Sequence, residues 1–329
     1  MKAGEVKLQE LLNGRIQYRV PLFQRTYSWR EENWQRLWDD IVEIYAAATP
    51  RRHFIGAIVT QPMEDAPEFA SKYMLIDGQQ RLTTLFILLA SIRDAAKGSS
   101  ETTSLANELD EEALFNKHVR RDEERAKIRP TQKDRADMNA VLDGKPATQS
   151  TLVGQARRFF GEVLSKGDLD GLPFDLFKLK SRVADYLDLV SIKLDASDSA
   201  PRIFESLNNT GMALTASDLV RNHIFMSIPN EAAQEAAYEQ HWRPMEERLA
   251  TANGGSALTD FFWRYLMMDG SLPVYDAVFE GIRDRIDRGL NSGRTIIEEL
   301  AELNDYSGLY AKISNPERFE TIAPIKDAQ

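Results

Sequence analysis

The sequence predicts a mixed α/β fold (α+β), in which a small sheet-containing unit carries a large helical portion, partly inserted and partly appended. Two short apolar runs, residues 54–60 and 73–76, have the length and composition of buried strands and predict the sheet. A third observation predicts the core. The segment from about 79 to 95 is apolar on nearly every side, so it should form a central helix.

The elements before the first strand follow from local patterns. Residues 6–12 are typical of a short helix and residues 16–21 of an extended segment, because Pro21 disfavours a helical conformation in the residue before it. Ser28 and Glu31 have the spacing of a capping box at the start of a longer helix. Apolar side chains three and four positions apart form one face of that helix: Trp34, Leu37, Trp38, Ile41, Ile44 and Tyr45.

The pattern changes beyond residue 95 and predicts the domain organisation. Residues 1–95 and 188–225 are expected to form the α/β unit, with strand character returning at 189–194. Residues 96–187 are expected to be a helical insertion and residues 226–329 a helical C-terminal region. Aromatic residues expected in the core of that last region are Trp242, Phe261, Phe262, Trp263 and Tyr265.

The composition excludes several classes of protein. The chain has 329 residues, 43% hydrophobic and 28% charged, with a mean hydropathy of -0.42. It contains no apolar run of membrane-spanning length, and a cytoplasmic location without membrane contact is expected. Cysteine is absent, which excludes disulfides and thiol nucleophiles. The four histidines lack metal-ligand spacing. Since the net charge is -10, any DNA contact must come from a local patch.

A turn at residues 77–81, Asp-Gly-Gln-Gln-Arg, joins the second strand to the central helix. Asp77 suits the helix N-cap, and Gln80 has the spacing to complete a capping box. Gly78 allows a ligand to approach the backbone closely. The amides of the first turn, the helix dipole and Arg81 then favour an anion such as a nucleotide phosphate. An ordinary capped core helix explains the segment equally well, since capping boxes are common.

A second segment, residues 21–29, combines aromatic, amide and guanidinium side chains ahead of the first long helix. Arg and Gln side chains read phosphates and base edges, and aromatic rings stack on bases. The candidate DNA contacts are Pro21, Phe23, Gln24, Arg25 and Tyr27. The alternative is that the aromatics are core residues. We favour the core for Trp29 and a functional role for Gln24 and Arg25.

A third motif spans residues 204–222 and contains an Asn-rich turn between two helices. Thr215 and Asp218 are expected to cap the second helix. Capping leaves Asn208 and Arg221 unexplained, so both are candidates for ligand binding.

A run of basic residues between 117 and 135 is a further candidate for nucleic-acid contact, although acidic residues are interspersed in it. The more common explanation of such a run is a solvated helix face. Its members are Lys117, Arg120, Arg121, Arg125, Lys127, Arg129, Lys133 and Arg135.

Four motifs occur in a fixed order. They are Gln24-Arg25-x-Tyr27-x-Trp29, Phe54-x-Gly56, Ile76-Asp77-Gly78-Gln79-Gln80-Arg81-Leu82-Thr83-Thr84-Leu85, and Phe204-x-x-Leu207-Asn208-x-x-Gly211-x-x-Leu214-x-x-x-Asp218-Leu219-x-Arg221-Asn222. Their order and spacing resemble the N-terminal domain of GmrSD-type modification-dependent restriction proteins. That domain also occurs in SspE-type effectors, which sense phosphorothioate DNA in anti-phage defence.

The resemblance implies a fold similar to the ParB/sulfiredoxin class and a turn that serves nucleotide binding and hydrolysis. It also implies coupling to recognition of modified DNA. In the family, a separate C-terminal domain of the His-Asn-His type usually cuts the DNA, and this chain is expected to lack that domain. In an SspE-like protein, the DNA contact would fall at residues 21–27. The sulfur of a phosphorothioate is larger and less hydrated than oxygen, so it suits an apolar wall beside a hydrogen-bond donor.

We therefore interpret the chain as the GTPase-like, DNA-modification-sensing domain of an anti-phage restriction protein. The expected catalytic residues are Asp77, Gln80 and Arg81, with Mg²⁺ held at Asp77 together with the triphosphate. The expected nucleotide-binding residues are Gly78, Gln79, Gln80, Arg81, Asn208 and Arg221. The alternative is a non-catalytic nucleotide- or DNA-binding module that controls a separate nuclease. A nuclease acting from this domain is disfavoured, because no cluster of His or carboxylate residues is evident.

Overall fold

The computed structural model describes the chain except residues 22–23, 64–69, 118, 120–121, 169, 196–197, 199–202, 204–214, 229, 251–256, 271 and 315–329. Its contacts divide the chain into two compact units. The first comprises Met1–Pro21 and Arg25–Phe204, and the second comprises Leu22–Gln24 and Glu205–Gln329. This division differs from the expected one, because the segment 188–225 is split between the two units.

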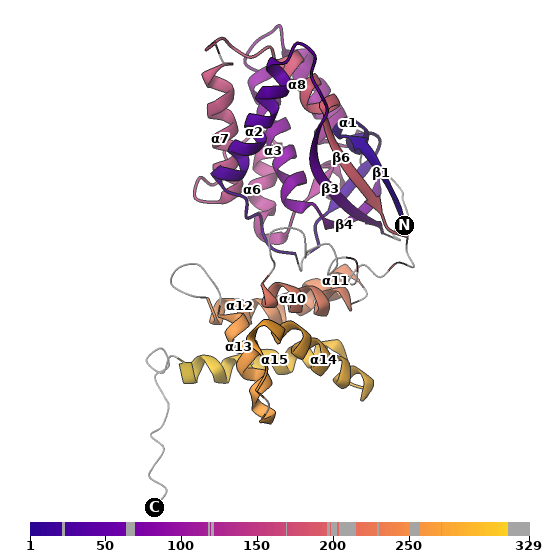
Figure 1. Ribbon diagram of the computed structural model, residues 1–329, viewed down its shortest axis with the longest axis vertical. Coiled ribbons are helices and arrows are strands. Elements are labelled where there is room, and N and C mark those ends of the chain that lie inside the picture. Colours follow the sequence, from indigo (N-terminus) through magenta and orange to yellow (C-terminus); the bar gives the residue numbers. More distant parts are fainter. Residues whose placement is uncertain are drawn as a thin grey trace, which may run out of the picture. The chain divides into compact units, whose positions relative to one another are not determined.

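The first unit is built on a six-stranded mixed sheet (Figure 1). The strands, in spatial order, are β1 (Lys2–Lys7), β6 (Leu187–Lys193), β3 (His53–Pro62), β4 (Ser71–Asp77), β2 (Ile16–Arg19) and β5 (Ile128–Arg129). β1 is antiparallel to β6 and β3 is antiparallel to β4, whereas the other neighbouring pairs are parallel. The predicted mixed α/β class is confirmed, and so are the strands expected at 54–60, 73–76 and 189–194.

The helices of the first unit pack around α3, which is buried on nearly every side. They are α1 (Leu8–Leu12), α2 (Glu31–Ala46), α3 (Gln79–Ala96), α4 (Thr103–Glu108), η1 (Leu109–Leu114), α5 (Asp122–Arg125), α6 (Gln132–Leu142), α7 (Leu152–Lys166) and α8 (Leu176–Tyr186). α3 contacts α4, η1, α6, α7 and α8, and Ile58 and Leu75 of the sheet join the same core. Figure 1 shows α6, α7 and α8 around α3. The prediction of a central apolar helix is therefore confirmed.

The helical insertion expected at residues 96–187 is not a separate domain. Its helices cover α3, and it also contributes β5, which pairs with β2 at the edge of the sheet. β5 has only two residues, so its apolar pattern is too short to predict a strand.

The expected capping box at Ser28 and Glu31 is not formed. α2 begins at Glu31, and the Asn33 side chain accepts a hydrogen bond from the Arg30 amide at 3.0 Å. The Ser28 amide instead donates to the Gln80 side chain at 2.7 Å. A bond from a distant part of the chain has replaced the local one.

The second unit is helical in its described part. Its helices are α10 (Ala216–Met226), α11 (Glu231–Ala237), η2 (Tyr238–Trp242), α12 (Arg243–Arg248), α13 (Leu258–Leu266), η3 (Met267–Asp269), η4 (Tyr275–Ala277), α14 (Val278–Asn291) and α15 (Ile296–Ser314). Phe261, Phe262, Tyr265 and Trp242 are buried as expected, but Trp263 is only half-buried and donates to the Pro273 carbonyl. Within the described ranges, no helix combines the length and apolar character needed to cross a membrane.

A buried arginine joins α3 to the elements that cover it. The Arg93 side chain is 1% exposed and donates to Asp94 at 2.7 Å and to Asp110 at 2.8 Å. It also donates to the backbone carbonyls of Val141 and Leu142 at the end of α6. The guanidinium thus bonds to acceptors on α3, η1 and the end of α6, and its role is structural.

We expect Arg93→Met to lower the free energy of unfolding by about 3 kcal/mol, since it removes the buried cation beside Asp94 and Asp110 and the donor to the Leu142 carbonyl. Arg158→Met is the control, because Arg158 is exposed on α7 and its ion pair with Glu162 is long, at 3.9 Å. Urea unfolding followed by circular dichroism measures both. Equal midpoints for the two variants would contradict the structural role of Arg93.

Candidate functional site

The turn at residues 77–81 places an uncapped helix N-terminus at the end of a strand. β4 ends at Asp77, and Gly78 is the N-cap of α3 with a φ of 88°. The first amide to bond within the helix is that of Leu82, which donates to the Gly78 carbonyl at 2.9 Å. No side chain among the described residues caps this end. The expected capping box of Asp77 and Gln80 is therefore wrong, because the Gln80 side chain bonds elsewhere.

Arg81 lies over an irregularity in β3. The pairing of β3 with β6 shifts register between Phe54 and Ala57, and Gly56 within this interval has a φ of 114°. The Arg81 Nη1 donates to the Ala57 carbonyl at 2.5 Å, and a Cβ atom at Gly56 would lie 2.5 Å from the Arg81 Cζ. The bulge thus makes room for the guanidinium group.

The surroundings of Arg81 also affect its charge. Burial lowers the pKa of the Arg81 guanidinium below its ordinary value, and the negative charge of Asp77 partly offsets this effect. A cation in such a half-buried position is attracted more strongly to an anion than an exposed one is, because water screens it less.

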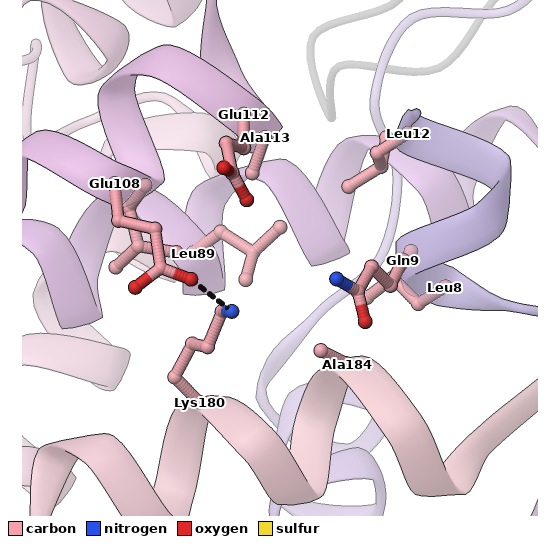
Figure 2. Close-up of a pocket in the computed structure, with 10 residues that line it drawn as sticks. Leu8, Gln9, Leu12, Leu89, Glu108, Glu112, Ala113, Lys180 and Ala184 are labelled. Carbon is pink, nitrogen blue, oxygen red and sulfur yellow. Dashed lines mark hydrogen bonds and ion pairs between the residues drawn. The ribbon is translucent and has the colours of Figure 1, made fainter. Parts of the chain in front are cut away.

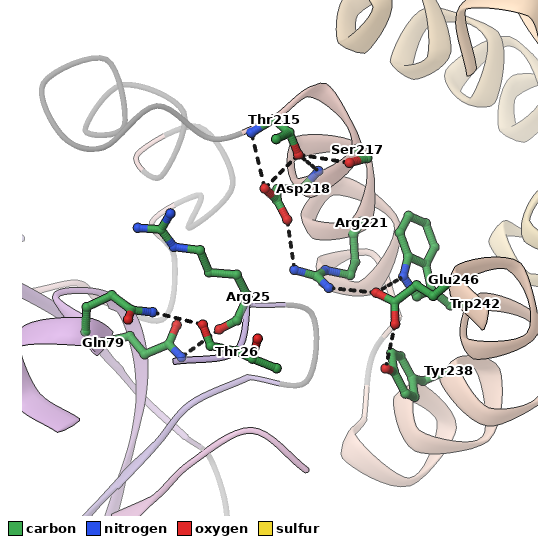
Figure 3. A network of polar contacts seen from close by, with 11 residues as sticks. Arg25, Thr26, Gln79, Thr215, Ser217, Asp218, Arg221, Tyr238, Trp242 and Glu246 are labelled. Atoms are coloured by element: carbon green, nitrogen blue, oxygen red, sulfur yellow. Dashed lines mark hydrogen bonds and ion pairs between the residues drawn. The ribbon is translucent and has the colours of Figure 1, made fainter. Parts of the chain in front are cut away.

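The side chains of Gln79 and Gln80 bond to residues 25–29. Both are buried, at 6% and 8% exposure. The Gln79 Nε2 donates to the Arg25 carbonyl at 2.7 Å, as Figure 3 shows. The Gln80 Nε2 donates to the Thr26 carbonyl at 3.2 Å, and its Oε1 accepts from the Ser28 and Trp29 amides at 2.7 and 3.3 Å.

The candidate DNA-contacting residues have different exposures in the structure. Tyr27 is 3% exposed, and its hydroxyl contacts Thr84 Oγ1 at 2.6 Å and accepts from the Trp34 indole at 2.7 Å. Tyr27 is therefore a core residue, and its expected direct contact with DNA does not fit this burial. Pro21 and Gln24 are also buried, Arg25 is half-buried, and Phe23 lies outside the described residues.

The described part of the third motif, residues 215–222, belongs to the second unit, where carboxylates accept from Arg221. It donates to Glu246 at 3.0 Å and to Asp218 at 3.1 Å (Figure 3). Glu246 also accepts from the Tyr238 hydroxyl and the Trp242 indole, so this cluster joins α10 to η2 and α12. The expected Thr215–Asp218 capping box is present. Asn208 lies outside the described residues, and its nucleotide contact stays a prediction, as does that of Arg221.

Three members of the basic run at residues 117–135 contact other parts of the first unit. Lys117 pairs with Glu111 at 2.6 Å and Arg125 with Asp143 at 2.8 Å. Lys127 is buried and donates to the carbonyls of Leu12 and Glu112, and burial lowers its pKa to about 8. Arg120 and Arg121 lie outside the described residues. The described contacts of these three residues favour a structural role over DNA contact.

Two further observations bear on ligand sites. A cavity of about 30 Å³ between α1, α3, η1 and α8 lies beside the Lys180–Glu108 ion pair (Figure 2). It has space for water but not for a nucleotide. In the described part of the chain, no group of three or more His, Asp or Glu residues could hold a metal by itself.

Comparison with known proteins decides the family. A family model described as "GmrSD restriction endonuclease, N-terminal domain" matches residues 8–225, which is more than half of the chain. The chain belongs to this family. The GmrSD match includes the turn at 77–81, the Gly56 bulge and the segment 25–29. The hydrogen bonds among these three segments therefore lie within the family domain. No curated protein matches the chain.

Membership of the GmrSD family identifies the chain as a component of a restriction system. The sequence patterns indicate no role for Gly56, for Thr84 or for Asp134, whose carboxylate accepts from the Tyr27 amide at 2.8 Å. Only Gly56 carried a usable signal, since an isolated glycine within a strand suggests a bulge or a close backbone approach.

We expect Gly56→Ala to destabilise the first unit by about 1–3 kcal/mol, because a side chain at this φ is strained and displaces the Arg81 guanidinium. Gly4→Ala in β1 is the matched control, since no described heavy atom outside its chain neighbours lies within 4 Å of that position. In an Arg81→Ala background, Gly56→Ala should cost less. An equal cost in both backgrounds would mean that the two residues do not interact. Thermal melts of the four variants and the wild type test this.

Proposed function

We propose that this GmrSD-type domain binds and hydrolyses a nucleoside triphosphate, GTP in the first instance, and couples hydrolysis to recognition of modified DNA. The observation that carries the proposal is the start of α3. Gly78 occupies the N-cap without a capping side chain from the described residues, and the amides of Gln79, Gln80 and Arg81 precede the first intrahelical bond. Helix amides in this position, with an arginine beside them, favour a phosphate group.

The chemistry would be attack of water on the terminal phosphoryl group. Negative charge spreads over the phosphoryl oxygens in the transition state, so cationic and amide donors that are already in place stabilise it. The Arg81 guanidinium has five N–H donors, and its bond to the Ala57 carbonyl uses one of them. The others can serve a phosphate oxygen.

Asp77 is the residue that would hold Mg²⁺ or orient the attacking water. Its carboxylate is half-buried at the end of β4, beside Arg81. A single carboxylate fits the role, because Mg²⁺ at nucleotide sites is usually bound by one or two carboxylates with substrate phosphates and water. When bound, the ion would neutralise charge on the phosphate oxygens.

The charge distribution favours DNA contact through the first unit. Residues 205–329 contain 11 Lys and Arg against 20 Asp and Glu, a net charge of 11 − 20 = −9 out of −10 for the whole chain. DNA would be repelled by so acidic a segment. Arg25 is the candidate contact in the first unit, because its side chain is only half-buried while its carbonyl is held by Gln79. Phosphorothioate DNA is the modified substrate that we propose.

Arg81→Ala is expected to reduce phosphate release from GTP or ATP with Mg²⁺ by about 100-fold or more, since one preorganised donor to the transition state is lost. Arg36→Ala, at an exposed position on α2, is the control for removal of a cation. Circular dichroism confirms that each variant is folded. A folded Arg81→Ala protein with wild-type turnover would refute the assignment, and binding without turnover in the wild type would favour the non-catalytic regulatory module.

Arg25→Ala is expected to weaken binding to a phosphorothioate duplex by about tenfold, because a donor at the sulfur-bearing phosphate is lost. Binding to the same sequence without sulfur should be weak in both proteins, since the net charge of the chain is negative. Fluorescence anisotropy with matched duplexes measures the effect, again with Arg36→Ala as control. Equal loss on both duplexes would mean that Arg25 contacts only the ordinary backbone.

A further inference from the structure

The two glutamines of the turn bind one short stretch of backbone, residues 25–29. Gln79 donates to the carbonyl of Arg25, and Gln80 bonds to the carbonyl of Thr26 and to the amides of Ser28 and Trp29. The contacts join positions more than 50 residues apart in the sequence. The stretch contains the candidate DNA contact Arg25, and the glutamines belong to the first turn of the helix proposed to bind phosphate.

The chemistry of these bonds explains why residue 80 is a glutamine. The Gln80 carboxamide donates through Nε2 and accepts through Oε1 at the same time. A glutamate could accept from the Ser28 amide but could not donate to the Thr26 carbonyl, and an apolar side chain could do neither. Because both side chains are buried, loss of either bond would leave backbone groups unpaired away from water.

The remaining anchors of residues 25–29 hold Tyr27. Its hydroxyl contacts Thr84, one turn further along α3, and its amide donates to Asp134 of α6. Thr84 Oγ1 also donates to the Gln80 carbonyl at 2.8 Å. The stretch is therefore attached to α3 at consecutive turns, and it has to follow or release the helix if the first turn moves.

We propose that Gln79 and Gln80 are positioning residues that couple the DNA-contacting stretch at residues 25–29 to the nucleotide turn; this rests on the function proposed above. A phosphate that shifts the first turn of α3 changes the hydrogen bonds to residues 25–29. DNA that displaces these residues changes the position of the first-turn amides. The coupling in binding is then reciprocal, because each ligand alters the other's affinity by the same factor.

The test compares Gln80→Met with Gln17→Met in the full chain. Gln17 is also a buried glutamine of the first unit, but its Nε2 donates to the Ala126 carbonyl at 3.0 Å. The first readout is the ratio of GTP hydrolysis with and without a phosphorothioate duplex. The second is hydrogen exchange of the Ser28 and Trp29 amides with and without a non-hydrolysable GTP analogue and Mg²⁺.

We expect the hydrolysis ratio to fall to about 1 in Gln80→Met and to keep its wild-type value in Gln17→Met. The analogue should change exchange at Ser28 and Trp29 in the wild type and in Gln17→Met but not in Gln80→Met. If Gln80→Met does not fold, Gln79→Met and Gln80→Glu replace it, since each removes a donor and leaves other contacts in place.

The outcomes separate the two proposals. If the wild type responds to duplex and analogue and the glutamine variants respond equally, the positioning role is refuted and the proposed function stands. If the wild type neither binds nor hydrolyses GTP, the proposed function fails and the coupling fails with it. A duplex that stimulates hydrolysis without any change in exchange at residues 28–29 also refutes the coupling.

Discussion

The complete burial of α3 is the constraint on which the first unit depends. From Leu82 to Arg93 every side chain of this helix is buried. A polar group that faces this part of the helix therefore needs a hydrogen-bond partner. Polar chemistry is therefore confined to the two ends. At the C-terminal end Arg93 joins the covering helices. At the N-terminal end Gln79 and Gln80 both bind residues 25–29, and Arg81 binds the Ala57 carbonyl.

This arrangement explains why several residues of the turn have specific structural contacts. Gly78 provides the left-handed conformation that a close approach to the Ala57 carbonyl requires, since a Cβ atom there would lie 2.8 Å from that oxygen. Arg81 reaches back to the same carbonyl. The strand bulge, the turn and the helix start are thus joined through one backbone carbonyl, that of Ala57.

Local pattern was sufficient to predict α3, the apolar face of α2 and the strands β3 and β4, because each is defined by periodicity and burial. It failed where a distant partner competes with a local one. Gln80 has capping-box spacing, but its side chain bonds to the backbone of Thr26, Ser28 and Trp29 instead. Its carbonyl accepts from the Thr84 hydroxyl. Tyr27 and Lys127 look like surface residues in the sequence, and only the fold shows that their polar atoms are satisfied inside the first unit.

The contact between Gly56 and Arg81 has an evolutionary consequence. The two residues lie in different elements, yet a side chain at position 56 and a guanidinium at position 81 cannot occupy the same space. Substitution at either position changes the selection on the other. The φ of Gly56 disfavours a side chain in any background and the guanidinium adds a steric barrier, so chains that keep the arginine should keep the glycine most strictly. A comparison of these two positions across relatives would show whether loss of the cation at position 81 is accompanied by loss of the glycine at position 56.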